Sequence, residues 1–131
     1  MGTSMGTILV VEDDPKLRFI IDSQLYSAGF EVVTEEGGDG ALTTLETLTP
    51  DLVLLNILLL PGIDGIEVCR RIRADERLAH IPVIFLTGRA NSESRAQCLS
   101  AGANDYVTKP WNSSDLILRI NRAIALARGE R

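Results

Sequence analysis

A chain of 131 residues has room for one domain of ordinary size and not for two. Its 45% hydrophobic and 24% charged residues exclude a disordered or fibrous protein. The 13 Lys and Arg against 18 Asp and Glu give a net charge of -5, so we expect no direct nucleic-acid binding and any DNA output from another chain.

We expect no contact with a membrane. The longest apolar run is Ile57–Leu60, far short of the roughly 20 residues that span a bilayer, and no signal segment is recognisable at the start of the sequence. Cys69 and Cys98 lie far apart without a CxxC pairing, which indicates buried, reduced thiols. We therefore predict a cytoplasmic protein.

A short apolar strand, a turn rich in Gly, Pro or Asp, and an amphipathic helix alternate along the chain. The predicted strands are Thr7–Val11, Glu31–Glu35, Leu52–Asn56, Pro82–Leu86 and Asn104–Val107. Most of them are too apolar to leave one face in water, so helices must cover both faces of a parallel sheet.

The first predicted helix has the clearest start. Pro15 suits the first helical position and Asp14 can cap the free amides before it. The apolar stripe of this helix is predicted from its spacing to be Leu17, Ile20, Ile21 and Leu25. The second helix follows with an apolar stripe of its own and ends before Pro50.

The remaining helices complete an alternating pattern. Asp64 is the predicted cap of the third helix, the fourth covers about residues 92–100, and the fifth is capped by Asn112 or Ser113. Right-handed crossovers then favour an α/β fold with five parallel strands in the order 2-1-3-4-5, which is flavodoxin-like.

Chemically useful side chains follow four of the predicted strands. They are Glu12 and Asp13 after the first strand, Asn56 at the end of the third, Thr87 after the fourth and Lys109 after the fifth. In such sheets ligands bind beyond the carboxyl ends of the strands. Two adjacent carboxylates suit Mg²⁺, and an added hydroxyl and ammonium would let the pocket hold a phosphoryl group.

Five ordered motifs carry a resemblance to a known family. They are the segments 8–15, 50–55, 61–65, 82–87 and 101–110. At this spacing they resemble the receiver domains of two-component response regulators, over about Thr7 to Ala127. The resemblance implies a receiver domain at 7–128 and a tail at 129–131. Residues 1–6 show no periodicity and contain a second Met, which indicates a flexible end or an expression remnant.

The resemblance also assigns roles to the residues at the strand ends. In receiver domains an acidic pair holds Mg²⁺, an aspartate after the third strand takes a phosphoryl group from a histidine kinase, and a lysine and a hydroxyl bind the phosphoryl oxygens. The matching positions here are Glu12 and Asp13 for the metal, Lys109 for the phosphoryl group, Thr87 for the switch hydroxyl and Tyr106 for the aromatic rotamer switch. A cis peptide before Pro110 is implied as well.

The phosphoryl-accepting aspartate is missing from this pattern. Counting forward from Pro50 places Asn56 in its position, and counting back from Pro61 places Ile57 there, because the stretch between holds one extra residue. We favour Asn56, whose polar tip suits a pocket, followed by a lengthened loop. An amide is not a nucleophile toward phosphorus, so transfer should fail, and the lost charge should leave a weak or vestigial Mg²⁺ site and no other cofactor.

Each of these residues also has a simpler explanation. Glu12 and Asp13 suit any turn that leads into a helix N-terminus, and Thr87 and Lys109 suit ordinary strand-end and surface positions. Tyr106 could be a half-buried strand aromatic. Asn56 could bond a neighbouring turn or could mimic one signalling state.

The leading hypothesis is a non-enzymatic interaction module that works without phosphorylation. Its partner would be a histidine kinase or another signalling protein, and its fourth helix, fifth strand and fifth helix would form a docking face that also serves a homodimer. The alternative is a functional phosphoacceptor in a histidine-kinase phosphorelay. The third hypothesis is a small flavodoxin-like enzyme or nucleotide binder. The sequence disfavours it, because it has no phosphate-cradling glycine loop and no Ser/His/Asp or Cys/His set.

Overall fold

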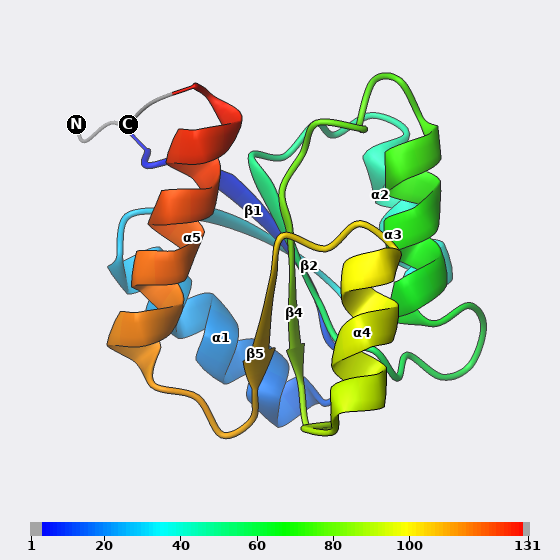
Figure 1. The fold of residues 1–131 in the computed structure, drawn as a ribbon. Coiled ribbons are helices and arrows are strands. Elements are labelled where there is room, and N and C mark those ends of the chain that lie inside the picture. The colour runs from blue at the N-terminus through cyan, green and yellow to red at the C-terminus, as the bar shows by residue number, and fades with distance from the viewer. Residues whose placement is uncertain (1–3, 130–131) are drawn as a thin grey trace.

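The computed structural model describes residues 4–129, so the first three residues of the predicted N-terminal end and the last two of the predicted tail lie outside the described residues. Figure 1 shows strands and helices alternating along the chain. Their bounds are β1 Thr7–Val11, α1 Pro15–Ser27, β2 Glu31–Glu35, α2 Gly38–Leu45, β3 Leu52–Leu55, α3 Gly65–Ala74, β4 Val83–Thr87, α4 Ser92–Ser100, β5 Asp105–Thr108 and α5 Ser113–Ala127.

All strand pairs are parallel and the order is β2-β1-β3-β4-β5, which confirms the predicted α/β flavodoxin-like fold. The pairing of β1 with β3 sets Val11 opposite Leu55. Glu12 and Asn56 therefore leave the sheet side by side, although they are 44 positions apart in the sequence.

The helices form a layer on each face of the sheet, as predicted. Figure 1 shows α1 and α5 on one face and α2, α3 and α4 on the other. Successive strand residues point to opposite faces, so Leu9 and Val53 belong to one buried cluster and Ile8 and Leu52 to the other. The two clusters hold the sheet rigid from both sides and fix the positions of its carboxyl ends.

The predicted bounds of β1 and β2 are confirmed, and those of the other strands differ by one residue. β4 begins at Val83 because Pro82 has no N–H to give to a ladder. β3 ends at Leu55, so Asn56 is the first residue of the following loop. One predicted stripe position is wrong: Ile20 is 42% exposed, because α1 turns only the narrower face with Ile21 and Leu25 toward the sheet.

The start of the chain is attached to this framework where the structure describes it. The Met5 N–H donates to the carbonyl of Gly29, and the Glu31 N–H donates to the carbonyl of Gly6. The predicted boundary at Thr7 and the tail from residue 129 stay predictions. Within residues 4–129, the helices are all too short or too polar to cross a bilayer.

Helix α1 offers a direct test of the capping prediction. The Asp14 carboxylate accepts hydrogen bonds from the N–H groups of Lys16 at 2.9 Å and Leu17 at 3.4 Å. Asp14→Ala should lower the free energy of unfolding by about 1 kcal/mol, measured by urea denaturation. Ser23→Ala, at an exposed site of the same helix, is the matched control, and an equal loss in both variants would contradict the capping role.

Candidate functional site

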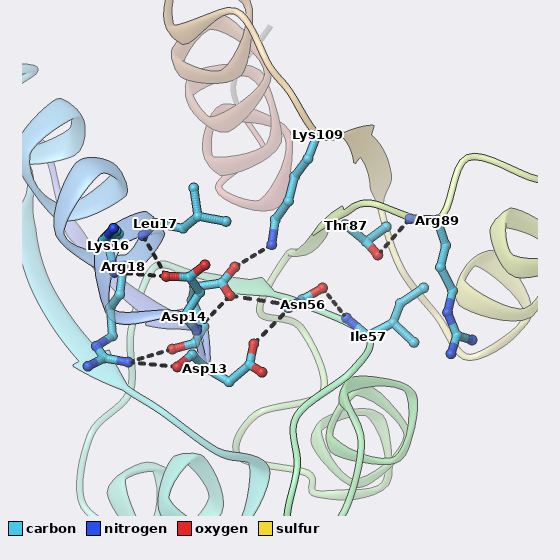
Figure 2. Close-up of polar contacts among 11 residues, drawn as sticks. Asp13, Asp14, Lys16, Leu17, Arg18, Asn56, Ile57, Thr87, Arg89 and Lys109 are labelled. Carbon is cyan, nitrogen blue, oxygen red and sulfur yellow. Dashed lines mark hydrogen bonds and ion pairs between the residues drawn. The ribbon is translucent and has the colours of Figure 1, made fainter.

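The predicted site residues meet at the carboxyl edge of the sheet. Figure 2 shows Asp13, Asn56 and Lys109 directed toward one another, with Thr87 beyond Asn56. The first three come from the ends of β1, β3 and β5, the strands whose register brings those ends together. The prediction that these residues share one edge is confirmed.

The Asn56 side chain bridges the two acidic residues. Its Nδ2 lies 3.4 Å from Glu12 Oε2 and 3.3 Å from Asp13 Oδ1, at the long end of hydrogen-bonding distance. Its Oδ1 accepts from the Ile57 N–H at 2.9 Å. The opposite amide orientation would set an oxygen against two carboxylates, so this network determines which end of the amide faces the acids.

The neighbouring residue Ile57 lies elsewhere. Its side chain is 1% exposed and packs in the same cluster as Leu55 and Leu59. Of the two candidates for the acceptor position, the structure brings Asn56 to the acidic pair and places Ile57 in the core.

Glu12 is a buried carboxylate with all its contacts inside the protein. Its side chain is 2% exposed, and Oε1 accepts a charge-assisted hydrogen bond from Lys109 Nζ at 2.6 Å. Oε2 accepts from the Asp14 N–H at 3.1 Å as well as from Asn56. Burial raises the pKa of Glu12, and the hydrogen bonds from Lys109 and the Asp14 backbone offset that rise in part.

This donor set fits Mg²⁺ only in part. The ion prefers one or two carboxylates together with water and phosphate oxygens, and Glu12 and Asp13 supply the carboxylates. However, the Asn56 amide hydrogens and the Lys109 ammonium face the oxygens that a cation would need. Within residues 4–129, no three acidic, His or Cys side chains are grouped to hold a metal ion.

The side chains of Thr87 and Tyr106 form hydrogen bonds with the backbone of the β4–α4 loop and not with the acidic pair. Thr87 Oγ1 accepts from the Arg89 N–H at 3.2 Å, and the Tyr106 hydroxyl donates to the Arg89 carbonyl. Tyr106 is 5% exposed, so it is a buried aromatic and not a half-buried one, and burial raises the pKa of its phenol. Both side chains are therefore hydrogen-bonded to the backbone of the same loop residue, Arg89.

Two aspartates close to the motif in sequence lie outside the site. Asp51 accepts from the Thr7 N–H at the opposite end of the sheet, and Asp64 caps α3 by accepting from Glu67. The cis peptide between Lys109 and Pro110 that the resemblance implied is present. A second one, between Leu60 and Pro61, was not predicted.

The sequence analysis did not identify Arg18 as part of the site. Its Nη1 donates to the backbone carbonyls of Glu12 at 2.9 Å and Asp13 at 3.5 Å, and so holds the acidic turn from the α1 side (Figure 2). An arginine six positions after a turn has no distinctive pattern, so only the folded chain identifies this contact.

Residues 8–121 match the family described as the response regulator receiver domain. The chain belongs to this family. The DNA-binding response regulator MtrA of Mycolicibacterium smegmatis is 41% identical to this chain over 120 residues, which are 92% of this chain and 51% of that protein. The chain thus spans about half the length of that relative.

Solved structures place it in the same family of folds. The receiver domain of the sensor histidine kinase PA1611 from Pseudomonas aeruginosa PAO1, with a magnesium ion in its active-site cleft, has a TM-score of 0.85 and 36% identity over 92% of this chain and 98% of that one. The signal receiver domain of a histidine kinase from Syntrophus aciditrophicus has a TM-score of 0.88 and 29% identity over 96% and 95%. The chain is therefore a receiver domain of two-component signalling.

Proposed function

We propose that this receiver domain is a protein-interaction module that works without phosphorylation, and that Asn56 stands in the position of the family's phosphoryl-accepting aspartate. The observation that carries the proposal is the contact of the Asn56 amide with both Glu12 and Asp13 at the end of β3. An amide offers neither the charge nor the nucleophilic oxygen of a carboxylate, so the phosphoryl group has no acceptor at this position.

The contacts around Asn56 support a site whose polar side chains already have hydrogen-bond and ion-pair partners without a ligand. The Asn56 amide faces the acidic pair, and the Lys109 ammonium neutralises the buried Glu12. We assign Glu12 and Asp13 as a vestigial metal pair, Lys109 and Thr87 as the counterparts of the phosphoryl-binding lysine and switch hydroxyl, and Tyr106 as the counterpart of the aromatic switch. The PA1611 receiver domain holds magnesium in its cleft, which supports a Mg²⁺ site here, and the donors of Asn56 and Lys109 make us expect a weak one.

The partners that we propose are signalling proteins, with a histidine kinase as one class. We also propose the face of α4, β5 and α5 as a further contact, including one between two copies, in which Arg119 would exchange its pairs with Asp105 and Asp115 within the domain for pairs with the partner. The net charge of -5 argues against direct DNA binding by this domain, although the related MtrA is named a DNA-binding protein. We propose a cytoplasmic location and no enzymatic activity.

Treatment with a small-molecule phosphodonor tests the proposal. After incubation with acetyl phosphate and Mg²⁺, intact-mass spectrometry of the whole chain should find no added phosphoryl group. A receiver domain with an intact acceptor aspartate, treated in parallel, is the positive control. A stoichiometric acyl-linked adduct between residues 51 and 64 would contradict the proposal and favour the alternative, a functional phosphoacceptor in a phosphorelay.

A further inference from the structure

The loop between β3 and α3 exposes two leucines. Leu58 is 45% exposed and Leu60 is 73% exposed, whereas Ile57 and Leu59, which alternate with them, are buried. This is the stretch in which the resemblance to receiver domains predicts one extra residue. Large apolar side chains in water cost free energy, and such a patch on a folded domain is a mark of a surface that a partner covers.

Leu60 and Pro61 form one side of a groove of about 440 Å³, which we call the acidic groove. Its other side is the turn from β2 into α2, with Glu35, Glu36 and Asp39, and Asp13 lies at the acidic-pair end. The two loops approach closely at Gly62, whose φ of 101° favours glycine and where a Cβ would collide with the Asp39 carboxylate. This close approach of the two loops holds Leu60 beside the carboxylates of the β2–α2 turn.

The acidic side chains of the groove give it a negative charge. Within residues 4–129, the ion pairs involve other side chains, and none includes Asp13, Glu35, Glu36 or Asp39. Glu35 and Asp13 accept hydrogen bonds only from the neutral side chains of Thr44 and Asn56 in the described contacts. Four carboxylates around one concave surface focus a negative potential there, which attracts cationic partners and repels anionic ones.

We propose that the acidic groove is a docking surface for a cationic amphipathic segment of a partner protein. Apolar side chains of that segment would cover Leu60 and Pro61, and its Lys or Arg side chains would face the four carboxylates. The charge disfavours a nucleic acid, and it disfavours a second copy that presents the same groove. This inference rests on the proposed function, because it names the class of partner for a domain that acts without phosphorylation.

A pair of synthetic peptides can test the proposal on the whole chain, with no phosphodonor present. One labelled peptide repeats Leu and Lys so that a helix has one apolar and one cationic face, and the other has Glu in place of Lys. Fluorescence anisotropy should show binding of the Leu–Lys peptide and none of the Leu–Glu peptide. Leu60→Ser, and Glu36→Gln with Asp39→Asn, should each weaken binding about tenfold.

Matched controls separate docking from general charge attraction. Leu118→Ser removes another exposed leucine, which is 57% exposed on α5, and Glu31→Gln with Glu76→Gln removes two charges from exposed positions outside the groove. These controls should change the affinity by less than about twofold. In NMR spectra the Leu–Lys peptide should shift the amide signals of residues 35–40 and 58–62.

Three results would overturn the proposal. They are equal weakening by the controls, shifts confined to α4, β5 and α5, and a dimer in sedimentation equilibrium that Leu60→Ser abolishes, which would place a second copy in the groove. Because the assay contains no phosphodonor, its failure would leave the absence of phosphoryl transfer at Asn56 untouched. The mass-spectrometric test judges that proposal separately.

Discussion

Asn56→Asp should convert this receiver domain into a phosphoacceptor. The variant sets a carboxylate beside Glu12 and Asp13, within reach of a network that already contains Lys109. A carboxylate oxygen can attack phosphorus, and the third negative charge completes a site for Mg²⁺. Acetyl phosphate with Mg²⁺ should then add one phosphoryl group to most of the variant and to none of the natural chain, measured by intact mass.

The same variant should make stability depend on Mg²⁺. Without the ion, a third carboxylate close to two others repels them, at a cost on the order of a few kcal/mol at intermediate dielectric. Binding of Mg²⁺ to the folded state alone restores that loss, so the melting temperature of the variant should rise with the Mg²⁺ concentration much more than that of the natural chain.

Asn56→Ala is the control for both measurements. It removes the amide but adds no charge and no nucleophile, so it should gain neither a phosphoryl group nor a strong response to Mg²⁺. If Asn56→Asp binds Mg²⁺ but takes up no phosphoryl group, another feature besides Asn56 prevents phosphoryl transfer in this domain. If Asn56→Ala is phosphorylated as well, the acceptor lies elsewhere and Asn56 is misassigned.

Lys109→Met should be the most destabilising exchange of a charged residue in the site. It leaves the carboxylate of Glu12, which is 2% exposed, without the ammonium 2.6 Å away. Removing one partner of a buried ion pair typically costs about 3–5 kcal/mol, because the remaining charge stays buried and unpaired. Urea denaturation at pH 7 should show a loss in this range.

The loss should depend on pH in a defined direction. Burial already raises the pKa of Glu12 above its ordinary value of 4.5, and removing Lys109 raises it further. A carboxyl with a raised pKa in the folded state favours folding below its unfolded pKa, and this contribution is lost as the pH rises through the folded value. The deficit of Lys109→Met should therefore be smallest near about pH 4 and grow toward about pH 7.

A double variant provides the control for this effect. Glu12→Gln with Lys109→Met removes both charges, so it should recover much of the stability at pH 7 and lose most of the added pH dependence. A loss in Lys109→Met that is the same at all pH values would mean that Lys109 contributes by packing and not by its charge.

Local chemistry was enough to determine the framework of the domain. Apolar segments and the caps Asp14 and Asp64 predicted the strands and two helix starts, because capping and apolar patterning act over a few residues. For the fifth helix they left Asn112 and Ser113 open, and the structure has Asn112 as the cap. The parallel alternation then predicted which edge of the sheet carries Glu12, Asn56, Thr87 and Lys109, since all carboxyl ends of parallel strands meet at one edge.

Other features depend on contacts between residues that are distant in the sequence. The count along the sequence left both Asn56 and Ile57 open, and only the folded chain shows that the amide of Asn56 contacts the acidic pair whereas Ile57 packs in the core. The pairing of Lys109 with Glu12 joins residues 97 positions apart. The acidic groove joins two loops and the end of β1, and no local pattern encodes it, because the relative positions of loops follow from how the helices pack on the sheet.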